Sequence, residues 1–253
     1  MITRRIATAI RQQDWTIILI EFVLVIVGVL IALELDQWSD SRAEDAQEID
    51  ILIAEKDALE QNISDMESYV RTLTAVSEFG GIATESLESD TCTDQCWPEL
   101  VAFFHASQWL DVGLSREVYD EMKRKGLPRD TPLREKLTSF YNVVEQSTRV
   151  GAELPRYREL VRSLIPAKTQ QHLWVACFKY VGKNQFYIGD CESPEDSGKT
   201  RATIERIKAT PEVESSLNYW ISTVTVIVST LHNQISEAKL MIEALSVYVE
   251  NEQ

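Results

Sequence analysis

Glycine, proline and positive charge are all scarce in this sequence. Only nine glycines and seven prolines occur among 253 residues, so few turns are signalled and a mainly α-helical fold is predicted. Lys and Arg number 25 against 40 Asp and Glu, which gives a net charge of −15. A surface that binds nucleic acid needs clustered basic side chains, so we expect no nucleic-acid partner.

Sequence signatures of catalysis and of metal binding are also lacking. The chain contains no G-x-S-x-G, no P-loop and no H-E-x-x-H. Its three histidines, His105, His172 and His232, lack the spacing of metal ligands. Carboxylates are so abundant that no pair stands out as a catalytic pair. We therefore expect no enzymatic activity, no cofactor and no bound metal.

One long apolar run lies near the N-terminus, from Thr16 to Leu35. Its 20 residues, taken as a helix, reach roughly 30 Å, the thickness of a bilayer core. The sequence thus predicts a cytoplasmic tail over 1–14, a transmembrane helix over 15–36 and an extracytoplasmic domain over 37–253. A cleaved signal peptide is the alternative, but it usually has a shorter apolar region and a small-x-small cleavage site, which the following LELDQW does not provide.

The distribution of charge predicts how the helix is oriented. Residues 1–14 carry a net charge of +2, whereas the remaining 239 residues carry −17. Basic residues flanking a span favour the cytoplasmic side. We expect a single-pass protein of a bacterial inner membrane, with its C-terminal domain in the periplasm.

One face of the predicted span combines an acid with small residues. Glu21, Val25, Gly28 and Ala32 fall within a stripe about 60° wide on a helix. Small residues let a second helix approach, which favours a partner transmembrane helix or a homo-oligomer. In the alternative, Glu21 reaches the cytoplasmic interface beside membrane lipid.

Four cysteines, Cys92, Cys96, Cys177 and Cys191, all follow the apolar run. Their position in an oxidising compartment favours the disulfides Cys92–Cys96 and Cys177–Cys191 over a metal site, for which Cys-x3-Cys is atypical. The segment LWVACFKYVGKNQFYIGDC predicts a β-hairpin with Lys183–Gln185 as its loop and Cys177 opposite Cys191.

Two stretches with helical periodicity flank the domain. In the first, apolar residues recur at steps of three and four, with a predicted end at Gly80-Gly81 and Lys56 at the one polar position; they are Ile49, Leu52, Leu59, Ile63, Met66, Val70 and Leu73. In the second, ten positions keep the same spacing from Leu217 to Val249. Val226 and Leu240 widen its stripe, so it is predicted to pack on more than one neighbour, either within a helical bundle or across a dimer seam.

Shorter helices are predicted between these two. One covers Pro98 to about Leu110, and another is capped by Ser115 and ends at Gly126. A third starts at Thr131-Pro132, and a fourth lies between Pro155 and Pro166.

The anchor IEFVLVIVGVLIALELDQWSD and the later SREVYDEMKRKGLPRDTPLREKLTSFYN resemble two motifs of an uncharacterised family of bacterial single-span membrane proteins. The resemblance covers under a quarter of the chain and implies topology without implying an activity. The residues that match the second motif are Tyr119, Asp120, Glu121, Gly126, Leu133, Arg134, Leu137, Phe140 and Tyr141.

Five of these polar and aromatic residues allow two interpretations. Tyr119, Asp120, Glu121, Arg134 and Tyr141 form either a polar pocket between two helices or an ion-paired helix crossing. Taken together, the sequence predicts a membrane-anchored extracytoplasmic interaction protein that acts as an accessory or scaffolding subunit of a membrane complex. The alternative is an extracytoplasmic ligand-binding sensor that signals through a partner.

Overall fold

The computed structural model describes residues 15–89, 92, 96–151, 153–181, 184–194 and 197–252. Over these residues the chain forms eight helices and one two-stranded β-hairpin, so the mainly helical prediction is confirmed. The chain divides into two compact units, residues 1–51 and 52–253. The predicted cytoplasmic tail, residues 1–14, lies outside the described residues.

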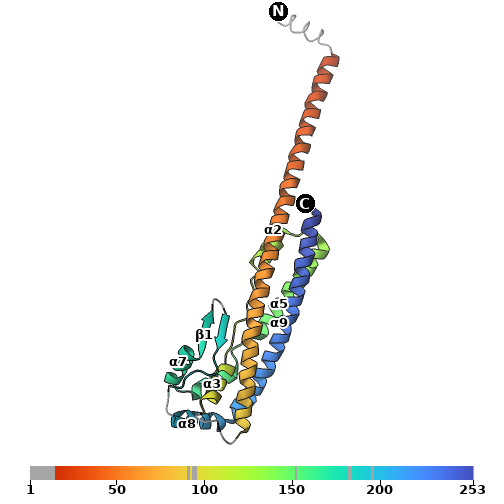
Figure 1. Cartoon of the computed structure of the whole chain (residues 1–253). Helices are drawn as coiled ribbons and strands as arrows, with labels where there is room; N and C mark the ends of the chain where they lie inside the picture. Colours follow the sequence, from red (N-terminus) through yellow and green to blue (C-terminus); the bar gives the residue numbers. More distant parts are fainter. Residues whose placement is uncertain are drawn as a thin grey trace, which may run out of the picture. The chain divides into compact units, whose positions relative to one another are not determined.

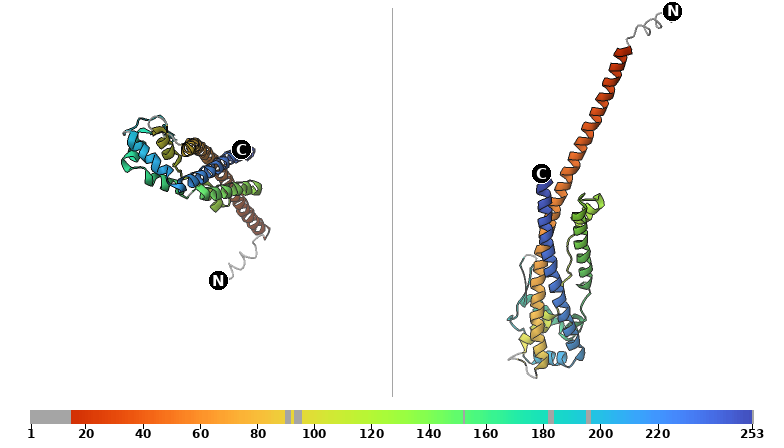
Figure 2. Two further views of the ribbon diagram at one scale, coloured as in Figure 1. Left: turned by 90° about the horizontal axis from the view of Figure 1, so that it is seen from below. Right: turned by 90° about the vertical axis from the view of Figure 1, so that its right-hand side faces the viewer.

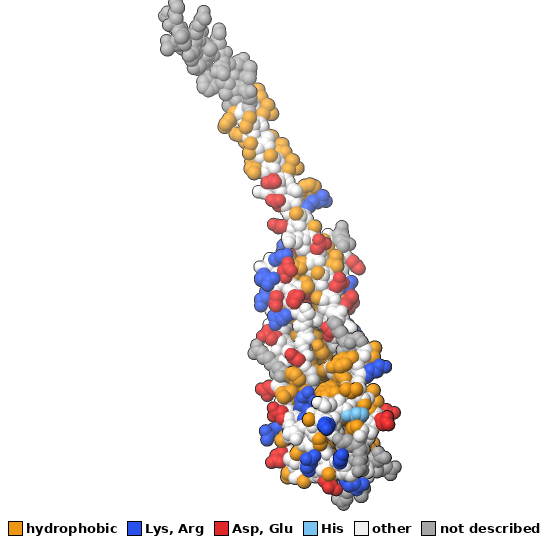
Figure 3. Space-filling model, turned by 90° about the vertical axis from the view of Figure 1, so that its left-hand side faces the viewer, with side chains coloured by type: hydrophobic (Ala, Val, Ile, Leu, Met, Phe, Trp, Pro, Cys, Tyr) orange, Lys and Arg blue, Asp and Glu red, His pale blue; other side chains and the backbone are white. Residues whose placement is uncertain are grey.

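Helix α2, Trp15–Glu88, begins with the apolar run. Its apolar side chains are exposed, and the apolar window counts as a candidate membrane span or signal sequence by length and composition. Figure 3 shows this part of the helix as a hydrophobic surface, followed by acidic side chains where the run ends. The two disulfides of the residues that follow support an extracytoplasmic location for them.

The predicted end of this helix at Gly80-Gly81 is wrong, because α2 continues through both glycines to Glu88. A Cβ atom added at Gly80 would collide with the side chain of Ile221, whereas one at Gly81 would meet nothing within 4 Å. Gly80 therefore serves close packing against a second helix and does not end the first one.

The buried stripe of α2 also differs from the predicted one. Leu59, Met66 and Leu73 are buried as expected, but Ile63 is only half-buried. The neighbouring stripe position is taken by Asn62, which is fully buried. The helix therefore faces the core through a seam that includes polar residues, which a count of apolar residues does not reveal.

Helix α9, Pro211–Glu252, confirms the second long helix. None of its ten predicted seam positions is exposed, and it packs against α5, α6 and α8 within the same chain. Figures 1 and 2 show α9 running beside α5 and the later part of α2. This arrangement is the intramolecular bundle, so the seam is already occupied within one copy.

The shorter helices follow most of the predicted boundaries. Helices α3 and α4 come before α5 in the chain. The observed ranges are α3 Trp97–Ala106, α4 Glu117–Lys125, α5 Thr131–Gly151, α6 Arg156–Leu164, α7 Ala167–Ala176 and α8 Ser197–Lys208. Gly126 adopts the left-handed conformation that ends α4, with φ of 72°.

Two predicted helix ends are wrong. Helix α3 stops at Ala106 and not near Leu110, because the Ser107 hydroxyl and amide both donate to the Phe104 carbonyl. Ser115 does not cap α4, whose N-terminal flanking residue is Arg116. The backbone N–H of Ser115 instead donates to the Asn62 side chain.

The hairpin is smaller than predicted and has a different register. Part of the expected first strand is helix α7, and the strands are β1, Phe178–Val181, and β2, Asn184–Tyr187. Phe178 pairs with Tyr187, so Cys177 lies opposite Ile188 and not Cys191. Lys183 lies outside the described residues, while Asn184 and Gln185 belong to β2.

Both predicted disulfides form nevertheless. Cys177–Cys191 joins the end of α7, just before β1, to the chain beyond β2, and Cys92–Cys96 closes a short loop before α3. The indole N–H of Trp97 donates to the Cys191 carbonyl at 2.7 Å, which fixes the disulfide-linked hairpin segment to α3.

Candidate functional site

The small-residue face of the anchor is open along α2. Gly28 has nothing within 4 Å of an added Cβ, and Val25 is 62% exposed. Ala32 is exposed as well, whereas the Glu21 side chain lies outside the described part of the chain. The stripe therefore remains available to lipid or to another helix.

The predicted polar cluster centres on two stacked tyrosines. The rings of Tyr119 in α4 and Tyr141 in α5 lie 4.2 Å apart at an interplanar angle of 17°. The Tyr141 hydroxyl donates to Glu55 Oε1 at 2.7 Å, and that of Tyr119 donates to Thr138 Oγ1 at 3.3 Å. Tyr141 and Glu55 are buried, so this contact joins α2, α4 and α5 in the core.

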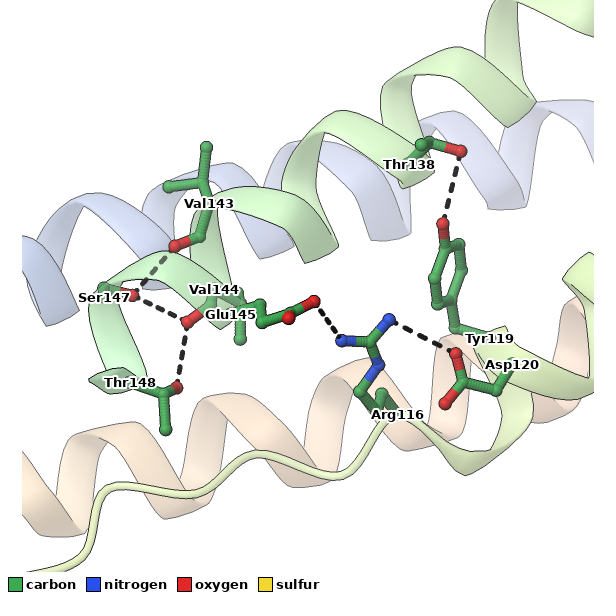
Figure 4. A network of polar contacts seen from close by, with 9 residues as sticks. All are labelled: Arg116, Tyr119, Asp120, Thr138, Val143, Val144, Glu145, Ser147 and Thr148. Atoms are coloured by element: carbon green, nitrogen blue, oxygen red, sulfur yellow. Dashed lines mark hydrogen bonds and ion pairs between the residues drawn. The ribbon is translucent and has the colours of Figure 1, made fainter. Parts of the chain in front are cut away.

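Arg116 ties α4 to α5 at the surface, as Figure 4 shows. Its guanidinium lies 2.9 Å from Glu145 on α5 and 3.3 Å from Asp120 on α4. Both carboxylates are partly exposed, and exposed ion pairs of this kind contribute little stability, about 0–1 kcal/mol each. Asp120 therefore takes part in an ion-paired crossing of α4 and α5.

The other two members of the cluster point elsewhere. Glu121 pairs with Lys125 one turn along α4, at 2.8 Å. Arg134 donates to the carbonyls of Gly126 and Pro128, which holds the loop between α4 and α5. Tyr119 and Arg134 do line a shared surface groove of about 430 Å³, but the structure does not bring all five residues into one pocket.

Glu55 was not singled out by the sequence. Burial raises the pKa of its carboxyl to about 7, although the hydrogen bond from Tyr141 opposes this shift. Burial also raises the pKa of Tyr141, as does the nearby Glu55. Glu55 Oε2 is buried and has no hydrogen-bond partner among the described residues. Because Glu55 is 0% exposed, it has no access to a substrate, and we assign it a structural role.

A groove runs between α5 and α9. Two adjoining hollows of about 520 and 280 Å³ share Val143, Thr230 and Gln234. A third, of about 560 Å³, extends the groove through Lys136 and Leu240. These shared residues make the groove continuous along the two helices.

Exposed apolar side chains line this groove. Val143 on α5 and Val226, Leu240 and Val247 on α9 are 51%, 57%, 59% and 54% exposed. Val226 and Leu240 were predicted to pack on a second neighbour, but no described part of the chain buries them. Large apolar side chains that gather in a groove mark interaction surfaces more often than scattered ones do.

Comparisons with known proteins provide no relative for this arrangement. No family model, no curated protein and no solved structure matches the chain. Within the part of the chain that the structure describes, no group of three His, Cys, Asp or Glu side chains lies close enough together to hold a metal ion.

Proposed function

We propose that this chain is a membrane-anchored extracytoplasmic interaction protein, a non-catalytic accessory or scaffolding subunit of a membrane complex. The observation that carries the proposal is the continuous α5–α9 groove, with its exposed apolar side chains, on a domain that follows a candidate membrane span. A groove between two helices suits a third helix, which docks its apolar side chains between them.

The partner we propose for the groove is a helix of another subunit. The α9 side carries both kinds of side chain: the polar Thr230, Asn233 and Glu237 lie between the apolar Val226 and Leu240. These positions repeat at steps of three and four, so they form a second stripe beside the buried seam. An amphipathic helix that offers apolar anchors and polar flanks fits such a stripe.

The anchor supports the same proposal through its topology. A basic segment before the span and an acidic domain after it favour a cytoplasmic N-terminus and a periplasmic domain. In this proposal the span holds the domain at the bacterial inner membrane, and the Gly28 face of the span meets a partner helix or a second copy.

Co-purification from native membranes in mild detergent tests the proposal. We expect the full chain to recover a stoichiometric protein partner. Leu240→Asp should release that partner, because it places a charge in the apolar groove, whereas Tyr219→Asp should retain it. Tyr219 lies on the same helix, is 76% exposed and does not line the groove. Recovery of the chain alone, or equal recovery with both variants, would overturn the proposal.

A further inference from the structure

Two arginines on α6 have no acidic partner among the described residues. Arg158 and Arg162 lie four residues apart and are half-buried on the same side of the helix. Neither forms an ion pair with any described carboxylate, although the sequence contains 40 acidic residues. A buried cation is costly unless an anion neutralises it.

Both guanidinium groups are held in fixed positions. The Arg162 guanidinium lies over the rings of Phe104 and Trp174, 4.2 and 5.0 Å from their centroids, and its Nε donates to Ser107 Oγ at 2.9 Å. Arg158 Nη1 donates to the Ser107 carbonyl at 2.9 Å. The two side chains therefore need little further ordering to bind a ligand.

Polar atoms beside the pair also lack hydrogen bonds. Arg162 Nη2, Gln108 Nε2 and the Tyr187 hydroxyl are buried and have no partner among the described residues. Gln108 is 3% exposed, and its Oε1 already faces Arg158 Nη1 at 3.4 Å. Its amide nitrogen, like Arg162 Nη2, can only donate. These neighbouring side chains thus have unsatisfied hydrogen-bond donors and no acceptor opposite them among the described residues.

The pKa shifts of both arginines also indicate that, among the described residues, a negative charge is missing beside them. Burial, and after it the positive charge of Arg158, lower the pKa of Arg162 to about 9. Burial also lowers the pKa of Arg158. A negative charge between the two arginines would oppose both effects.

We propose that Arg158 and Arg162, with Gln108 and Tyr187 beside them, form a binding site for a small free anion of the carboxylate, sulfate or phosphate type. The planar fork of a guanidinium matches the oxygens of these anions in a bidentate manner. Arg158 Nη2 and both terminal nitrogens of Arg162 make no hydrogen bond to described residues, so each arginine has at least one nitrogen available to an anion. The site shares no residue with the α5–α9 groove, and it goes beyond the proposed interaction function.

Thermal unfolding of the full chain in detergent tests the site, with sodium sulfate, phosphate and acetate compared against sodium chloride at equal ionic strength. At ten times the Kd, a bound anion should raise the Tm by about 3 °C or more, with saturation. Arg158→Gln and Arg162→Gln should abolish the saturable part. Arg156→Gln should retain it, because Arg156 is exposed on the same helix.

Isothermal titration with the same three anions keeps the test independent of stability. Saturable heat in the wild type and in Arg156→Gln, but not in Arg158→Gln, is the expected result. Sulfate also stabilises proteins generally through exclusion from their surface, and that effect is neither saturable nor specific to a variant. No saturable binding by the wild type, or equal binding by Arg158→Gln and Arg156→Gln, would overturn the assignment. A failed co-purification would leave this result unaffected.

Discussion

Buried polar residues decide which segments lie against α2. Asn62 is fully buried, and its side-chain amide both accepts from the Ser115 N–H, at 3.0 Å, and donates to the Ser115 carbonyl, at 2.8 Å. Glu55, two turns earlier, accepts the hydrogen bond of Tyr141. An unpaired polar group in a core is costly, so α2 is held in the one register where both residues find partners.

Glu55→Gln should change how stability depends on pH. The pKa of Glu55 is raised from 4.5 to about 7, so between these values the folded state binds a proton that the unfolded state has lost. Its contribution is therefore fully present below pH 4.5 and is lost as pH rises through 7. The loss amounts to at most about 3 kcal/mol. Gln cannot ionise and keeps an acceptor for Tyr141.

Urea unfolding of the full chain in detergent at pH 5 and pH 8 measures this effect. We expect the wild type to lose stability between the two values by more than Glu55→Gln does. Glu60→Gln is the matched control, because Glu60 is exposed on the same helix, and it should follow the wild type. Equal pH dependence in wild type and Glu55→Gln would show that the carboxyl titrates normally.

Sequence patterns predicted the apolar residues of this region better than the polar ones. Tyr119 and Tyr141 were singled out, and they do stack. Glu55 and Asn62 were missed because a periodicity of apolar residues assigns every charged or amide side chain to the surface. Ser115 was predicted to cap a helix because serine is common at that position. Its actual hydrogen bond is to Asn62, 53 positions away in the sequence, and a local motif cannot predict so distant a partner.

The long helices were the most predictable elements. Ten positions at steps of three and four defined α9, and the observed helix extends six residues before the first of them. By contrast, the apolar stretch around Trp174 was assigned to a strand although it is helix α7. Short apolar runs fit either a buried helix or a strand, and only tertiary packing decides between them.

Gly80→Ala should destabilise the domain by about 1–3 kcal/mol, because a new Cβ would overlap the Ile221 side chain in a packed interface. Gly81→Ala adds the same methyl group where nothing lies within 4 Å. It should stabilise α2 by about 0.5–1 kcal/mol, since alanine is the better helix former. The free energies of unfolding of the two variants check this pair. If both glycines behaved as helix breakers, both substitutions would stabilise the chain.

The whole molecule combines a basic N-terminal segment, an apolar helix and an acidic, disulfide-linked domain. Fusion of alkaline phosphatase or green fluorescent protein to Gln253 tests the proposed topology. We expect an active phosphatase and a dark fluorescent protein, because phosphatase needs the oxidising periplasm and the fluorescent protein exported in an unfolded state does not mature. The reverse pattern would place the domain in the cytoplasm, where its disulfides would be unusual.

Assembly through the anchor is the last property to test. Glu21, Val25, Gly28 and Ala32 share one face of the helix, and bulky residues such as Val23 occupy the opposite face. Gly28→Leu should displace a partner helix, because leucine fills the space where another backbone would approach. Val23→Leu on the opposite face should leave the partner bound. Both substitutions add only apolar atoms, so insertion into the membrane should survive in each.

The measurement is recovery of partners, or of the homo-oligomer, after extraction of each variant in mild detergent. Glu21→Leu extends the series, because it removes a polar contact worth about 1–2 kcal/mol at most, and it should weaken recovery less than Gly28→Leu does. Equal recovery with Gly28→Leu and Val23→Leu would mean that the glycine face meets lipid. Assembly would then rest on the α5–α9 groove, and Leu240→Asp would be the variant that still separates the chain from its partner.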